Sequence, residues 1–94
     1  MMRNYNPSDR QKVYARVLAK NGPITQITKC VEEMAELIKE LCKSMAGAPN
    51  LMHIAEEIAD VQITVEQMIQ IYRIEEMVIK CRNMKMDSLE KRIG

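Results

Sequence analysis

The chain has 94 residues and a formal net charge of +1, and 47% of its residues are hydrophobic. This length predicts a single domain over residues 1–94 with a small core. The near-zero charge disfavours proteins that bind nucleic acid or an anionic membrane through their overall field. The first residues are polar and no apolar run is long enough to span a bilayer, so we expect a cytoplasmic protein without signal peptide or membrane span.

The kinds of apolar residue favour helices. There are nine Met but no Phe or Trp, and Met and Leu suit helices whereas strands prefer aromatic and β-branched residues. The composition therefore predicts an all-α fold.

The three cysteines, Cys30, Cys42 and Cys81, are odd in number and lack CxxC spacing. We expect them to be reduced, buried thiols and not a disulfide or zinc site.

The first helix is expected to run from Ser8, as its N-cap, to about Asn21, because Gly22-Pro23 stops it. Its apolar stripe consists of Val13, Val17 and Leu18, with Tyr14 beside it.

The second helix is expected from about Ile24 or Thr25 to Met45. Its apolar residues recur at alternating spacings of four and three, which is the helical period: Ile27, Val31, Met34, Ile38, Leu41 and Met45. Residues 46–50 form a short break, and Asn50 is a suitable N-cap for a third helix over about Leu51–Tyr72.

A last helix covers about Ile74 to Arg92. The junction at Tyr72-Arg73 contains no Gly or Pro, so the pattern allows one long helix or a tight turn, and it also allows a bend near residues 83–88. The expected architecture is a bundle of three to four helices that is completed by oligomerisation.

Acidic residues form two clusters on the second and third helices. Glu33 and Glu36 are three residues apart, as are Glu57 and Asp60, and helical residues at this spacing share a face. Because the break between the two helices is short, we expect an antiparallel hairpin that brings the four carboxylates into one cleft. Such a group repels itself unless a cation is present, and Mg²⁺ prefers oxygen ligands and shares its shell with substrate phosphates.

The pattern Glu32-Glu33-x-x-Glu36 followed by Glu57-x-x-Asp60 resembles the signature of the MazG-like all-α nucleoside triphosphate pyrophosphohydrolases. Further likeness lies around Gln26, in residues 31–37 and 56–61, and in Lys85-x-x-x-Leu89-x-x-Arg92. The resemblance covers about residues 10–93 and is closest to the short single-domain members.

The resemblance implies that Glu33, Glu36, Glu57 and Asp60 bind Mg²⁺, with Mn²⁺ as a substitute. It implies catalytic roles for Glu32 and Glu36 in orienting and deprotonating water. The expected reaction converts a (d)NTP to the (d)NMP and pyrophosphate, as in housecleaning of the nucleotide pool. The family forms dimers or tetramers, so we expect a homo-oligomer that binds a nucleoside triphosphate.

Five residues are the expected substrate contacts, with Tyr72 as an alternative to the last two: Lys85, Arg92, Gln26, Tyr14 and His53. Lys85 and Arg92 fit the family pattern for phosphate contacts, and Gln26 lies in the block that precedes the first motif. The family often stacks the base on Trp or Phe, which this chain lacks, so Tyr14, Tyr72 or His53 takes that role. Position 88 is Ser where the family often has Arg, and the base preference stays open.

Three other classes remain as alternatives. In a non-catalytic helical oligomerisation module, the acids would be surface residues and the methionines would bind a partner. A ferritin-type di-metal bundle requires Glu-x-x-His motifs, whereas the chain has only the reversed His53-x-x-Glu56. The acidic centre of the chain argues against a nucleic-acid-binding module.

Overall fold

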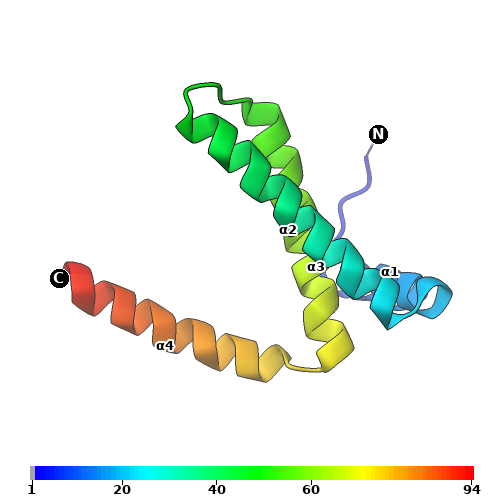
Figure 1. Ribbon diagram of the computed structural model, residues 1–94. Coiled ribbons are helices and arrows are strands. Elements are labelled where there is room, and N and C mark those ends of the chain that lie inside the picture. Colours follow the sequence, from blue (N-terminus) through cyan, green and yellow to red (C-terminus); the bar gives the residue numbers. More distant parts are fainter. Residues whose placement is uncertain (1) are drawn as a thin grey trace.

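A computed structural model describes residues 2–94, which form four helices and no strand: α1 (Pro7–Asn21), α2 (Pro23–Met45), α3 (Leu51–Tyr72) and α4 (Glu75–Ile93). The predicted all-α class is confirmed. α2 and α3 form an antiparallel hairpin, α1 packs beside the end where α2 begins and α3 ends, and α4 extends away (Figure 1). No helix within residues 2–94 is long and apolar enough to cross a membrane.

The N-cap of α1 is Asn6, so the prediction of Ser8 was wrong. The Asn6 side chain accepts a hydrogen bond from the backbone N–H of Asp9 at 2.8 Å, and the Asp9 carboxylate accepts one from the N–H of Asn6 at 3.2 Å. This reciprocal pair is a capping box. It places Pro7 at the first helical position, where its missing N–H costs nothing.

The other helix ends follow the sequence closely. Gly22 adopts a φ of 83° between α1 and α2, a conformation that glycine reaches without steric penalty. Asn50 caps α3 by accepting a hydrogen bond from the N–H of His53 at 3.1 Å, as predicted. Arg73 has a φ of 54° and turns the chain sharply between α3 and α4. These are therefore separate helices, and α4 continues through residues 83–88 without a break.

Polar residues form much of the contact between α2 and α3. Gln26 and Gln67 are both buried, and the Gln26 amide donates to the Gln67 side-chain oxygen at 3.4 Å. Among the described residues, the buried apolar ones are Tyr14 and Cys30. Cys42 and Cys81 are exposed, so the prediction of buried thiols is correct only for Cys30.

The apolar stripe of α2 points away from α3. Val31 is 62% exposed and Ile38 is 61% exposed, whereas Gln26, Cys30 and Glu40 of the same helix are buried. The half-buried Glu33 lies on the α3 side of α2, as the expected cleft requires, whereas most of the apolar stripe is exposed.

A hydrogen-bonded network joins α1 to α3. The Arg10 guanidinium donates two hydrogen bonds to the Glu66 carboxylate, at 2.9 and 3.0 Å, and the Tyr14 hydroxyl donates a third. The bonds from Arg10 and Tyr14 hold the pKa of Glu66 below its usual range despite partial burial. Burial, followed by the contact with Glu66, raises the pKa of Tyr14 to about 12.

Replacing Tyr14 with Phe should lower the free energy of unfolding at neutral pH by about 1 kcal/mol, the net value of one such hydrogen bond. Because the pKa of folded Tyr14 is raised to about 12, this contribution is complete below about pH 10, the unfolded value. It is lost as the pH rises through the folded value. Urea unfolding at pH 8 and pH 11.5 tests this, and a difference between Tyr14→Phe and wild type that stays constant would contradict it.

Candidate metal centre

Three carboxylates from the hairpin converge at one point. Glu33 comes from α2, and Glu57 and Asp60 come from α3, where their spacing of three puts them on one side of the helix. One oxygen from each residue lies within 4.8 Å of the other two. Glu33 and Glu57 are half-buried and Asp60 is exposed, so the group is open to solvent on one side.

Glu57 is the most constrained member of this triad. Its Oε2 atom is buried and has no hydrogen-bond partner among the described residues. Burial raises the pKa of Glu57, and the negative charges of Glu33, Asp60 and Glu36 raise it further. An unpaired carboxylate oxygen beside two other carboxylates is an unfavourable arrangement for a protein without a bound cation.

Asp60 is subject to similar forces. Its partial burial raises its pKa, and the adjacent negative charge of Glu33 adds to this shift. The positive charge of Lys29 lowers the pKa of Asp60. The Lys29 ammonium lies 3.4 Å from a Glu33 oxygen, one helical turn away on α2. The lysine therefore neutralises part of the triad's charge.

Two residues near the site were absent from the predicted set. Lys29 could have been found from its spacing of four with Glu33. Glu40 lies seven residues after Glu33 on the same face, is buried, and adds its charge to the field at Glu57. It pairs with Lys43 at 3.2 Å and with His53 at 3.4 Å.

The remaining predicted carboxylates lie at the edge of the triad. Glu36 is exposed and is outside the group of three, although its charge contributes to the raised pKa of Glu57. Glu32 is exposed on α2. The structure thus brings together three of the four predicted metal ligands and places Glu36 within electrostatic range of them.

Two of the predicted substrate residues have structural partners of their own. Gln26 is buried between the helices, where it binds Gln67 and Asn21. Tyr14 is buried and binds Glu66, which lies nine residues after Glu57 and hence about 13 Å along α3 from it. Within one chain, both side chains are thus separate from the triad.

The other three predicted substrate residues are exposed. His53 lies one turn before Glu57 but its Nδ1 is paired with Glu40 at 3.4 Å. Lys85 and Arg92 lie on α4, which packs only against α3 among the described helices and extends away from the hairpin (Figure 1). A single chain therefore does not bring these two basic residues to the carboxylates.

A hollow of about 1070 Å³ lies between α1, α3 and α4 and not at the triad. Tyr14, Glu66, Ile79 and Arg82 contribute to its walls, whereas Glu33, Glu57 and Asp60 do not. We therefore assign the candidate chemistry to the carboxylates and not to this hollow.

Comparisons with protein-family models, curated protein sequences and solved structures found no match to this chain. The resemblance to the MazG-like family therefore remains a prediction that rests on the two acidic motifs and their flanks.

The donor set fits a hard divalent cation. All three converging groups are carboxylates, which suit Mg²⁺ and Mn²⁺ better than softer metals. The buried, unpartnered oxygen of Glu57 is the specific feature that a cation would satisfy. Three protein ligands would leave coordination positions for water and for phosphate oxygens, as is usual for Mg²⁺.

Proposed function

We propose that this protein is a Mg²⁺-dependent nucleoside triphosphate pyrophosphohydrolase that converts a (d)NTP to the (d)NMP and pyrophosphate. The observation that carries the proposal is the convergence of Glu33, Glu57 and Asp60 from two helices, with one buried oxygen left unpaired. The order of the acidic motifs along the chain and the all-α hairpin that carries them support the same class.

In this proposal Glu33, Glu57 and Asp60 hold the metal, and Glu36 completes the site from one turn along α2. When bound, Mg²⁺ neutralises the triphosphate and lowers the pKa of a coordinated water. Water attacks the α-phosphorus, the bond from that phosphorus to the bridging oxygen breaks, and pyrophosphate leaves. Glu36, which is exposed and not committed to the triad, accepts the proton of the attacking water, with Glu32 orienting it.

Substrate binding in this proposal requires more than one chain. Lys85 and Arg92 lie on a helix that extends away from the hairpin, so they contact the phosphates of a nucleotide bound to another copy. His53, one turn from Glu57, remains the nearest candidate for contact with the base, whereas Tyr14 and Gln26 support the fold. The protein would act as a cytoplasmic homo-oligomer in nucleotide housecleaning.

A second function, a non-catalytic interaction module, is favoured by a different observation, the exposed apolar stripe of α2. The two functions differ in what they require of the carboxylates. A module that only binds a partner gains nothing from divalent cations, whereas the proposed enzyme requires one.

The test is pyrophosphate release from a panel of ordinary and damaged nucleoside triphosphates, measured with Mg²⁺, with Mn²⁺ and with EDTA. We expect equal amounts of monophosphate and pyrophosphate with either metal, and none with EDTA. Release of inorganic phosphate in place of pyrophosphate would contradict the assigned bond cleavage. A well-folded protein without activity on the whole panel would favour the interaction module.

A further inference from the structure

The exposed stripe of α2 has the pattern of a helix-pairing surface. We call it the outer seam, and it consists of the half-buried Ile27 and five exposed residues, Val31, Met34, Ile38, Leu41 and Met45. The spacings are four, three, four, three and four, which is the heptad repeat of residues that pack helix against helix. Val31 and Ile38, seven residues apart, are β-branched, and each is followed three residues later by an unbranched-Cβ residue, Met34 and Leu41.

The residues beside the outer seam permit close approach. Thr28, Ala35 and Cys42 flank it on one side and are small and uncharged. Leu37, half-buried, and Ser44 lie on the other side, toward α3. The charged residues of α2 lie farther round the helix, so that a second helix can pack here without burying an unpaired charge.

The chain also exposes more surface than a compact monomer of its mass. A compact monomer of 10.9 kDa exposes about 5,600 Å², whereas this chain exposes 7819 Å². The excess is about 2,200 Å² for each chain. Two chains together have an excess of about 4,400 Å², and obligate homodimers bury roughly 2,000–5,000 Å² in total, so a homodimer can cover an excess of this size.

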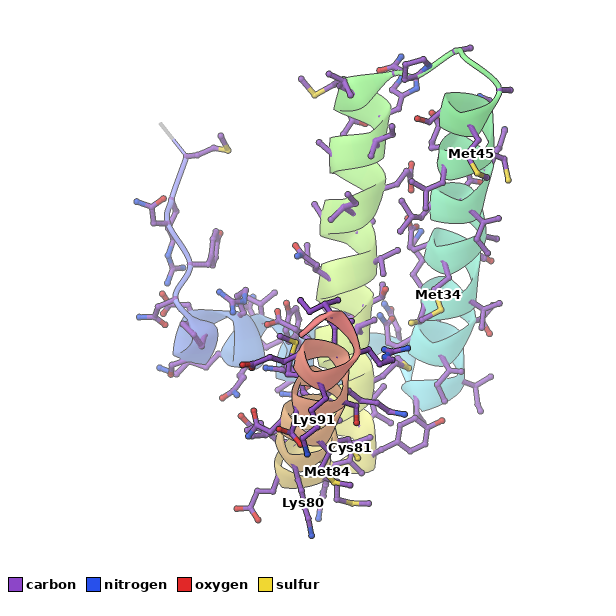
Figure 2. The ribbon with its side chains drawn as sticks, turned by 90° about the vertical axis from the view of Figure 1, so that its left-hand side faces the viewer. Met34, Met45, Lys80, Cys81, Met84 and Lys91 are labelled. Atoms are coloured by element: carbon purple, nitrogen blue, oxygen red, sulfur yellow. The ribbon has the colours of Figure 1, made fainter. Side chains whose placement is uncertain are left out.

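The outer seam faces a space that a second copy can enter. The hairpin and α4 diverge from their junction at Arg73 (Figure 1). Figure 2 shows Met34 and Met45 on the side of α2 toward which α4 extends, whereas Met84 lies on the side of α4 that points away from the hairpin. α4 itself has no buried residue, although most helical stability in proteins comes from tertiary packing of an apolar face.

We propose that the outer seam of α2 packs against the outer seam of a second copy of this chain, within the angle between hairpin and α4. A closed two-fold contact uses the same patch on both subunits, and an uncharged apolar patch is complementary to itself. The surface area favours a second copy because it matches the requirement of a stable homodimer. The proposal identifies the surface of the oligomer expected from the sequence, and it holds whether or not the carboxylates bind a metal.

The test is the molar mass in solution, measured by sedimentation equilibrium over a 100-fold range of concentration. Wild type should have twice the mass of one chain, and Ile38→Glu should weaken self-association by at least 100-fold. Met84→Glu is the matched control, since Met84 and Ile38 are both 61% exposed, and it should leave the mass unchanged. A monomeric wild type, or loss of association in Met84→Glu alone, would overturn the proposal.

Cross-linking covers the case in which Ile38→Glu fails to fold. Met34 lies at the middle of α2, so it faces its counterpart in the second copy whether the two helices run parallel or antiparallel. In a chain with Cys42→Ser and Cys81→Ser, Met34→Cys should form a disulfide-linked dimer on mild oxidation, and Met84→Cys should not. Equal cross-linking of the two variants would reject the outer seam as the interface.

Discussion

Replacing Glu57 with Gln should reduce Mg²⁺-dependent pyrophosphate release by at least about 100-fold, because the loss of even an indirect metal contact commonly costs 10–100-fold. The change keeps the shape of the side chain and removes its charge. Asp60→Asn should have a comparable effect, since both residues place an oxygen in the same triad. Initial rates at saturating Mg²⁺, together with the helical circular dichroism signal, measure the effect on a folded protein.

The matched control for this prediction is Asp87→Asn. Asp87 is a carboxylate on α4 that is exposed and paired with Lys91 at 3.0 Å, so its neutralisation should leave the rate within about two-fold of wild type. Full activity in Glu57→Gln would show that Glu57 is not part of the active site. Full activity in Asp60→Asn as well would show that the triad takes no part in the reaction.

Local signals were sufficient to predict the start of α3 and the convergence of three of the four acids. Asn50 precedes an uninterrupted apolar pattern, so its role as cap could be read directly. Because residues 46–50 are too few for any connection except a tight hairpin, the spacing of Glu33, Glu57 and Asp60 predicted their meeting. At α1 we predicted Ser8 as the cap, whereas Pro7 at the first helical position was the signal that should have selected Asn6.

The direction of the α2 faces was not predictable in the same way. A heptad of apolar residues shows which side of a helix is buried in the final assembly, but it does not show whether the covering surface belongs to the same chain. Gln26, Glu40 and Gln67 look like solvent-exposed residues because of their polarity, yet they lie buried between α2 and α3. The partners that join them across the two helices, Gln67 for Gln26 and His53 for Glu40, become neighbours only in the hairpin.

Divalent cations should stabilise this protein, and the carboxylate triad determines by how much. Mg²⁺ at 100 times its dissociation constant should add about 2.7 kcal/mol to the free energy of unfolding, provided that it binds only the folded state. This gain should disappear in Glu57→Gln. Thermal unfolding with Mg²⁺ and with EDTA measures it, and Ca²⁺ and Mn²⁺ titrations rank the preference of the site.

In the metal-free protein, Glu57→Gln should change the melting temperature in the opposite direction. Without a cation, the Glu57 charge is held beside Glu33 and Asp60 with one buried oxygen unpaired, so Glu57→Gln should raise the melting temperature in EDTA. A Gln amide can donate a hydrogen bond to a neighbouring carboxylate, and it removes one repulsive charge. A variant that is more stable than wild type in EDTA and less stable in Mg²⁺ identifies a binding site, because a surface cluster without a ligand gives the same order of stability in both buffers.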